Sequence, residues 1–443
     1  GERREQYRDK YCIKYMEIIE SLKLKEKEYI EKLENGMTVI IIPKPELDKK
    51  YVIWGTHFGS IDNRFIMPNS GEEVFIPDGV AHFLEHKMFE QPNGTNSLDT
   101  MMALGLDANA YTTNDHTAYL FECTDHFYEG LDELMDYVQH PYFTDENVEK
   151  EKGIIAQEIK MYDDEPGWRL YMNAMDCMYK ENPIKIDIAG SVDSISKITP
   201  DVLYKCYNTF YNPSNMIMVV CGNFKPEEIL EEIKRRIIPH QKQGEIKRIY
   251  PDKEKGINKP YMEMEMEVSL PLFAIGFKDL ENNSNKEELV KKHIAIEILL
   301  NMIIGKSSEG YKELYEKGIL IAEPDMDYEF SDEYAHIVIS GQSNDPEKVK
   351  AKIEETINSF KEKGLTDEHF NRIRKKVYGD YVVEYNSVGD IARMFLSDKM
   401  KGINSFDYIE KYNDVTKEYA ETILKNVFKK ENMVMSVVKS KKM

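Results

Sequence analysis

Stretches of continuous or alternating apolar residues are interspersed with stretches in which apolar residues recur about every 3.6 positions along the first half of the chain. The first pattern predicts strands and the second predicts helices. The predicted strands cover residues 29–33, 37–42, 51–58, 111–122 and 215–221. The predicted helices cover residues 5–24, 81–89, 128–139 and 145–161. Asn35-Gly36 joins the first two strands and predicts a tight hairpin turn, because both central positions of such a turn need a positive φ.

The pattern restarts after a polar stretch at residues 239–260, which is rich in Lys and Gly and predicts a linker. Beyond it, predicted strands cover residues 261–269, 273–278 and 334–341, and predicted helices cover residues 287–304, 346–361 and 366–385. Both halves contain a strand, a helix, a Thr-Asp-Glu triplet and a long helix, in that order. Placing Thr144 on Thr366 aligns the triplets and sets Glu158 opposite Asp380.

This correspondence predicts a duplicated α+β unit of about 200 residues. The alternative is a chance recurrence of common elements. We therefore predict two homologous domains, 1–238 and 261–443, joined by the linker at 239–260. Each domain should hold a mostly antiparallel sheet with helices packed on one face, and the two should face each other about a cavity.

Composition and charge exclude several classes of protein and of function. The chain has 443 residues, of which 41% are hydrophobic, so it can bury large cores and is not wholly disordered. Its net charge of −21 speaks against nucleic-acid binding. It lacks any run of about 18 apolar residues, which predicts no membrane span, and residues 1–10 lack the apolar core of a signal peptide. The cysteines are odd in number and scattered, which predicts reduced thiols in the cytoplasm.

One predicted helix carries a candidate metal site, His82-Phe-Leu-Glu85-His86. Residues four apart on a helix share a face, so His82 and His86 can present two imidazole nitrogens to one metal ion. Glu85 lies at the edge of that face, where its carboxylate can reach a metal-bound water without itself ligating. The order H-x-x-E-H is that of the inverted-motif zinc peptidases. The alternative is a charged surface helix with two incidental histidines.

A catalytic zinc needs a third protein ligand and one open position. Glu151 and Glu158 lie seven residues apart on the predicted helix 145–161, so both carboxylates share one face. One of them can ligate the metal, and the other can lie behind a ligand or near the substrate. A solvated acidic face is the alternative, but the apolar stretch 153–156 indicates a partly buried helix, where a carboxylate needs a partner.

These residues resemble the pitrilysin family of inverted-motif zinc peptidases, which includes insulin-degrading enzyme and mitochondrial processing peptidase. The resemblance covers nearly the whole chain, and the length is similar to that of two-domain bacterial subunits of the Bacillus type. It rests on the H-x-x-E-H motif, on the carboxylate pair some 70 residues later, and on Asn109-Ala110-Tyr111-Thr, which is similar to the family's substrate strand.

The resemblance implies a role for each matching residue. His82, His86 and Glu158 match the zinc ligands, Glu85 matches the general base, and Glu151 matches the auxiliary acidic residue. A Zn²⁺ ion at this place would polarise the scissile carbonyl and lower the pKa of its water.

The resemblance also implies where the peptide binds. Asn109, Ala110 and Tyr111 match the edge strand that pairs with the substrate backbone, and an extended peptide added as a strand binds with little sequence demand. An ordinary turn or strand-end residue is the alternative interpretation of Asn109.

The chain departs from the family in its second half. The family places an Arg and a Tyr from the second domain, or from a partner subunit, over the scissile bond. Residues 307–328 contain no Arg, and Tyr315 and Ala322 stand where Arg and Tyr are expected. The second half has no H-x-x-E-H either, since its helix offers only His293 and Glu297. We therefore expect a heterodimer with a homologous, metal-free sister subunit that supplies the clamp, with a homodimer as the alternative.

The sequence thus predicts a cytoplasmic zinc metalloendopeptidase subunit that hydrolyses unfolded leader, precursor or fragment peptides. The first rival is a non-catalytic core or recognition subunit of a processing complex. The second is a non-peptide metal hydrolase or lyase with a similar motif, such as S-ribosylhomocysteine lyase. The intact motif argues against the first rival, and the duplicated length argues against the second.

Overall fold

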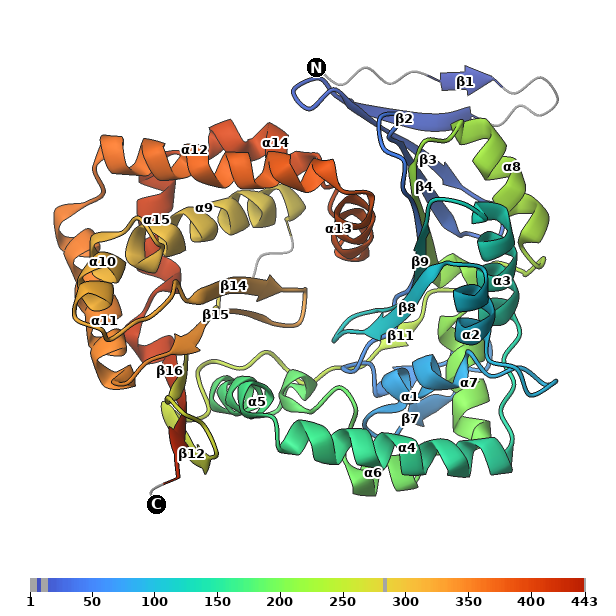
Figure 1. Cartoon of the computed structure of the whole chain (residues 1–443), viewed down its shortest axis with the longest axis horizontal. Coiled ribbons are helices and arrows are strands. Elements are labelled where there is room, and N and C mark those ends of the chain that lie inside the picture. The colour runs from blue at the N-terminus through green and yellow to red at the C-terminus, as the bar shows by residue number, and fades with distance from the viewer. Residues whose placement is uncertain (1–5, 9–14, 282–284, 442–443) are drawn as a thin grey trace. The chain divides into compact units, whose positions relative to one another are not determined.

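The computed structural model describes residues 6–8, 15–281 and 285–441 (Figure 1). The described residues group into two compact units, each assembled from three segments. Unit 1 draws on Gly1–Ile159, Asp187–Ile249 and Val382–Ser405, and unit 2 draws on Lys160–Ile186, Tyr250–Tyr381 and Phe406–Met443. The compact units are therefore interleaved along the chain, whereas the sequence predicted contiguous domains on either side of a linker.

Unit 1 is built on an eight-stranded sheet in the order β1-β2-β3-β4-β10-β5-β9-β8. Its strands are β1 (Gln6–Arg8), β2 (Tyr15–Ser21), β3 (Glu26–Lys32), β4 (Thr38–Pro43), β5 (Lys50–Thr56), β8 (Asp107–Thr112), β9 (Thr117–Cys123) and β10 (Met216–Gly222). Neighbouring strands are antiparallel except β4 and β10, which are parallel. A small second sheet contains β6 (Arg64–Ile66), β7 (Glu73–Phe75) and β11 (Lys247–Arg248).

Helices cover one face of the large sheet. They are α1 (Val80–Lys87), α2 (Ser97–Ala103), α3 (Phe127–Gln139), α4 (Asp145–Asp163), α6 (Val192–Ser196), α7 (Pro200–Phe210) and α8 (Pro226–Arg236). Alternate strand residues point at this face, so Val52 and Trp54 of β5 join the same buried core as Phe83 of α1 and Leu134 of α3.

The opposite face of the sheet is packed by α13 (Val388–Met400), which comes from the C-terminal half of the chain. Gly55 of β5 faces this helix, and a Cβ there would lie 2.9 Å from the Leu396 side chain. The Arg393 guanidinium donates a hydrogen bond to the hydroxyl of Tyr51 at 3.0 Å. The sheet of unit 1 is thus covered on both faces, although the sequence predicted helices on only one.

Unit 2 holds a five-stranded sheet in the order β12-β16-β13-β15-β14. Its strands are β12 (Tyr261–Met266), β13 (Leu272–Lys278), β14 (Asp325–Phe330), β15 (Ala335–Gln342) and β16 (Met433–Ser440). Its helices are α5 (Pro166–Met178), α9 (Lys286–Ile304), α10 (Glu309–Glu316), α11 (Pro346–Lys363), α12 (Asp367–Val383), α14 (Asp407–Lys411) and α15 (Lys417–Val427).

The sheet of unit 2 repeats five strands of unit 1. The order β12-β16-β13-β15-β14 matches β4-β10-β5-β9-β8, including the single parallel pair. Gly276 of β13 matches Gly55 by register, and a Cβ there would lie 3.1 Å from Met178 of α5. Each sheet therefore accepts one helix from the other half of the chain, which explains the interleaved units. The predicted α+β class with two homologous sheet-and-helix domains is confirmed.

The predicted helix at 5–24 is wrong. Its described part forms β1 and β2, while residues 1–5 and 9–14 lie outside the described residues. β2 pairs antiparallel with β3, with Glu17 opposite Ile30. Pairing with a neighbouring strand overrides the local helical pattern here, because tertiary context decides such marginal segments.

Two further predictions need correction. The single strand predicted at 111–122 is a hairpin of β8 and β9, which the turn at Asn114-Asp115 separates. The hairpin at Asn35-Gly36 is confirmed, but only Gly36 has a positive φ, at 91°. The Asn35 side chain instead accepts a hydrogen bond from the Met37 N–H at 3.0 Å.

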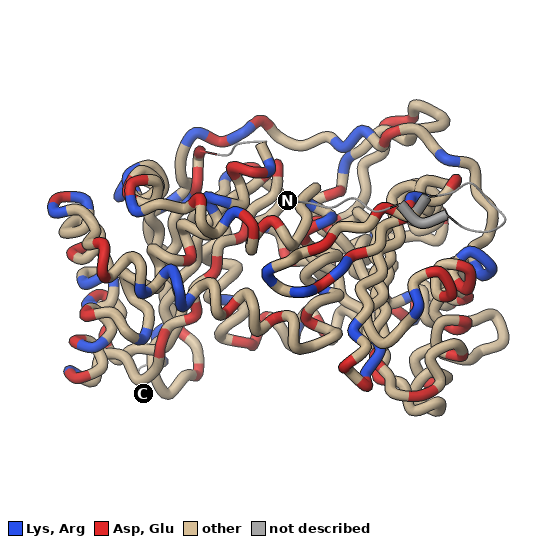
Figure 2. Tube along the Cα trace, turned by 90° about the horizontal axis from the view of Figure 1, so that it is seen from above, with Lys and Arg blue, Asp and Glu red and all other residues tan. Residues whose placement is uncertain are grey.

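None of the helices in the described parts of the chain is both long and apolar enough to cross a bilayer. Figure 2 shows basic residues interspersed with acidic ones along the trace, so the net charge of −21 is spread over the chain. Cys123, Cys177, Cys206 and Cys221 are buried free thiols.

Candidate metal centre

Helix α1 carries the H-x-x-E-H motif and is anchored in the core of unit 1. Val80, Phe83 and Leu84 are almost fully buried and hold the helix against the sheet. Gly79 precedes the helix with φ 95°, and a Cβ there would lie 2.5 Å from the Ala189 carbonyl oxygen. Only glycine fits this entry, so Gly79 lets the chain begin the helix close against the backbone at Ala189.

Helix α4 supplies the two carboxylates. At its start Asn147 and Thr144 cap each other, because each side chain accepts the other residue's N–H, at 3.1 and 2.9 Å. Val148, Ile155 and Ile159 bury one side of the helix in the core. Residues 151 and 158 lie beside that buried side, two turns apart, so both carboxylates point toward α1.

The structure brings His82, His86 and Glu158 together. One ligand atom of each lies within 4.8 Å of the other two. His82 Nε2 is 3.6 Å from one Glu158 oxygen, and His86 Nε2 is 3.4 Å from the other. Ligands about 2.0–2.2 Å from a tetrahedral zinc lie about 3.3–3.6 Å from one another. The observed separations therefore fit a zinc ion without rearrangement of the backbone.

Glu151 lies behind one of the imidazoles. Its Oε1 is 3.0 Å from His86 Nδ1, which directs Nε2 of the same ring toward Glu158. Burial lowers the pKa of His86, but the hydrogen bond to Glu151 and the charges of Glu85 and Glu158 outweigh it and raise the pKa. A carboxylate behind a metal-ligating histidine sets its tautomer and its orientation. The other histidine differs, since Nδ1 of His82 has no hydrogen-bond partner among the described residues.

Glu85 is 8% exposed and faces the same space as the histidines. One of its oxygens is 3.8 Å from His86 Nε2, and the other is 3.5 Å from the hydroxyl of Thr112 on β8. Burial raises its pKa, while the neighbouring histidines oppose that shift. A carboxylate held here can exchange a proton with a group bound at the three-residue cluster.

Strand β8 carries the predicted substrate residues and forms the edge of the sheet beside α1. Asn109 and Tyr111 point to the face that α13 covers, and Ala110 points toward α1. The Asn109 side chain accepts a hydrogen bond from the Ala110 N–H at 2.8 Å, and the Tyr111 hydroxyl is 3.4 Å from a ring nitrogen of His116. In the described sheet β8 pairs only with β9, so its other edge is open.

The predicted residues therefore fall into one region of unit 1. Thr112 has no predicted role beyond its place in the Asn-Ala-Tyr-Thr stretch, although the two-residue period of β8 places it on the α1 side. His293 and Glu297 of α9, the pair that the second half offers, form no comparable cluster among the described residues. His293 is 2.8 Å from Glu297 and 2.7 Å from the Tyr408 hydroxyl. Tyr381 also donates a hydrogen bond to Glu297. Among the described residues, one group alone meets the geometry of a three-ligand metal site.

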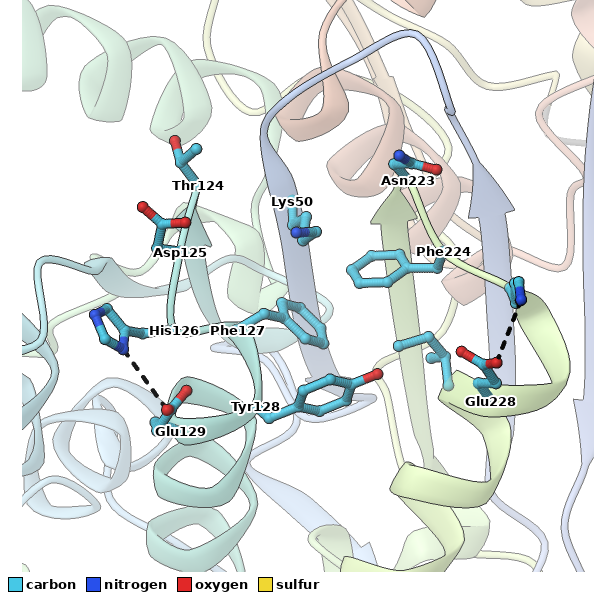
Figure 3. Close-up of a pocket in the computed structure, with 12 residues that line it drawn as sticks. Lys50, Thr124, Asp125, His126, Phe127, Tyr128, Glu129, Asn223, Phe224 and Glu228 are labelled. Atoms are coloured by element: carbon cyan, nitrogen blue, oxygen red, sulfur yellow. Dashed lines mark ion pairs between the residues drawn. The ribbon is translucent and has the colours of Figure 1, made fainter.

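A separate cavity of about 500 Å³ lies at the opposite end of the strands in unit 1 (Figure 3). His126 pairs with Glu129 at 3.6 Å and Lys225 pairs with Glu228 at 3.7 Å along its wall. The residues of the metal cluster do not line this cavity. The cavity is therefore separate from the metal cluster.

Comparison with known proteins places this geometry in a family. The description "Insulinase (Peptidase family M16)" matches residues 75–191, and "Peptidase M16 inactive domain" matches residues 197–377. A Bacillus subtilis protein named uncharacterized zinc protease YmfH is 39% identical over 410 residues, which cover 92% of this chain and 95% of that protein. The chain belongs to peptidase family M16.

Solved structures of M16 proteins have the same fold as this chain. An M16-like peptidase from Alicyclobacillus acidocaldarius matches with a TM-score of 0.90 at 34% identity, over 95% of this chain and all of that chain. Pitrilysin matches at 16% identity with a TM-score of 0.71, over 99% of this chain but 47% of its own, which shows a shared fold. The resemblance to the pitrilysin family is confirmed.

Proposed function

We propose that this M16 protein is a zinc-dependent endopeptidase that hydrolyses unfolded leader, precursor or fragment peptides. The observation that carries the proposal is the convergence of His82, His86 and Glu158 beside Glu85. Two imidazoles and one carboxylate are a donor set that zinc prefers, and they leave the open position that a catalytic site needs. The zinc-protease name of the Bacillus relative supports the same metal.

A zinc ion held by these three residues supplies a Lewis acid that polarises the scissile carbonyl and makes water easier to deprotonate. Glu85 takes the proton of the attacking water and delivers it to the leaving amine nitrogen, as a general base and then a general acid. Glu151 keeps the His86 ring in the orientation that this requires.

The peptide binds as a strand added to the open edge of β8. Main-chain hydrogen bonds from an edge strand provide affinity without a strong sequence preference. Asn109, Ala110 and Tyr111 form that edge, and the Ala110 N–H now bonded to Asn109 is a donor that a peptide carbonyl can take over. The substrate must therefore be extended, which favours unfolded peptides.

A second chain completes the site in this proposal. Residues 307–328 lack the Arg that the family places over the scissile bond. We propose a heterodimer with a homologous, metal-free subunit, with a homodimer as the alternative. Strong peptidase activity from the pure monomeric chain would contradict this part. The cytoplasmic location stays a prediction that rests on the cysteine pattern.

The proposed activity is tested by cleavage of an unstructured peptide library, with and without added zinc. We expect zinc-dependent internal cleavage that Glu85→Gln abolishes while zinc binding remains. Glu149→Gln is the matched control, because Glu149 lies on an exposed part of α4 and pairs with Lys152. Zinc binding without cleavage, even with a homologous chain from the same cell, would favour the non-catalytic subunit instead.

A further inference from the structure

Thr112 is the last residue of β8 and lies next to Glu85. Its Oγ1 is 3.5 Å from Glu85 Oε1. In the described parts of the chain, no other side chain donates a hydrogen bond to that carboxylate. The orientation of Glu85 therefore depends on a hydroxyl that belongs to the edge strand and not to the helix.

The composition of β8 explains why this hydroxyl reaches α1. Side chains alternate along a strand, so Ala108, Ala110 and Thr112 share the face that packs toward α1. The two alanines pack against the core of unit 1 and let the strand approach the helix closely. Thr112 is the one polar member of this row, and its hydroxyl points at the carboxylate.

The main-chain N–H and C=O of Thr112 point in a different direction from its side chain. The Thr113 N–H donates to the His116 carbonyl at 2.8 Å in the hairpin turn. Hydrogen-bonded and non-hydrogen-bonded pairs alternate in an antiparallel ladder. Thr112, opposite Thr117, is then a non-hydrogen-bonded pair, so its N–H and C=O point to the open edge. One residue thus offers its main chain to an added strand and its side chain to Glu85.

We propose that Thr112 is a positioning residue that couples peptide addition at β8 to the alignment of Glu85. The inference rests on the proposed peptidase function and deepens it. The contact is long in the free protein, as catalytic hydrogen bonds often are before substrate binds. A peptide strand that pairs with the Thr112 main chain holds the end of β8 in place, and the hydroxyl then holds the carboxylate toward the attacking water. The base is aligned only when a peptide is present.

The test compares Thr112→Val, which keeps the shape and loses the hydroxyl, with Thr112→Ser, which keeps the hydroxyl. We expect Thr112→Val to lower kcat about 10- to 150-fold, the range for one hydrogen bond to a charged group, with KM nearly unchanged. Thr112→Ser should retain most of kcat. Thr422→Val, on an exposed face of α15, is the control and should change neither value.

A second measurement does not depend on turnover. In a crystal structure of the zinc-free protein with a bound peptide, the distance from Thr112 Oγ1 to Glu85 should shorten to about 2.7 Å. A distance of 3.5 Å or more in that complex, or full kcat in Thr112→Val, would overturn the inference, as would equal losses in Val and Ser. If the zinc-loaded wild type cleaves no peptide, the proposed function fails, and the distance in the complex still decides the role of Thr112.

Discussion

The hydrogen bond between Glu151 and His86 predicts how a residue that does not touch the metal controls metal affinity. Glu151 Oε1 lies 3.0 Å from His86 Nδ1, and its side chain is only 12% exposed. Loss of such a partner behind a ligating histidine costs about 10- to 100-fold in metal affinity, or about 1.4–2.7 kcal/mol. Glu151→Gln keeps a neutral acceptor, so its loss of zinc affinity should be near tenfold. Glu151→Ala removes the hydrogen bond altogether, so its loss of zinc affinity should be near a hundredfold.

The assay is a competition titration of zinc against a chromophoric chelator at fixed pH and ionic strength. Glu158→Gln removes a ligand and should weaken binding more than either change at Glu151. Glu149→Gln is the control on the same helix, where the carboxylate is 70% exposed. Wild-type affinity in Glu151→Ala, or an equal loss in Glu149→Gln, would refute the reasoning, because zinc affinity would then not depend on the His86 contact.

Three further outcomes follow from the same structure. Free zinc at a hundred times its Kd should raise the free energy of unfolding by about 2.7 kcal/mol in the wild type, and denaturant titration should show no such gain in Glu158→Gln. Gly276→Val should destabilise the zinc-free protein by about 1–3 kcal/mol, because its Cβ would lie 3.0 Å from Val434, whereas Gly153→Ala, with no atom within 4 Å, should not destabilise it. Burial raises the pKa of Asp115, but the hydrogen bond to His116 at 2.6 Å and the nearby positive charges of His116, Lys401 and His57 together outweigh it and hold that pKa below its usual value. Asp115→Asn should therefore cost about 2 kcal/mol at pH 7, and the loss should shrink as the pH falls below about 4, where the unfolded chain takes up the proton; a pH-independent loss in urea titrations would contradict this.

The metal cluster could be predicted from the sequence because its geometry is local. His82 and His86 share a helix face at any position in a fold, and so do Glu151 and Glu158. The sequence alone left open which of the two carboxylates faces both imidazoles. The structure answers this through the packing of α4, whose buried residues turn Glu158 toward both rings and Glu151 toward His86 Nδ1.

Features that depend on distant contacts could not be predicted. The helical pattern at 5–24 has no local sign of the pairing with β3 that makes it a strand. The packing of α5 and α13 on the sheet formed by the other half of the chain is also invisible in the periodicity, because either helix could pack on either sheet. Its trace in the sequence is a pair of strand glycines, Gly55 and Gly276, whose missing side chains make room for those helices. The contact between the Thr112 hydroxyl and Glu85 could not be predicted either, since only the approach of β8 to α1 brings the two side chains together.

The central claim is that His82, His86 and Glu158 together bind one zinc ion. The most direct test is an anomalous difference map from crystals of the zinc-loaded protein, measured above and below the zinc absorption edge. The account predicts one strong peak about 2.0–2.2 Å from Nε2 of each histidine and from a Glu158 oxygen. Zinc bound only elsewhere, or a peak that persists unchanged in Glu158→Gln, would contradict it.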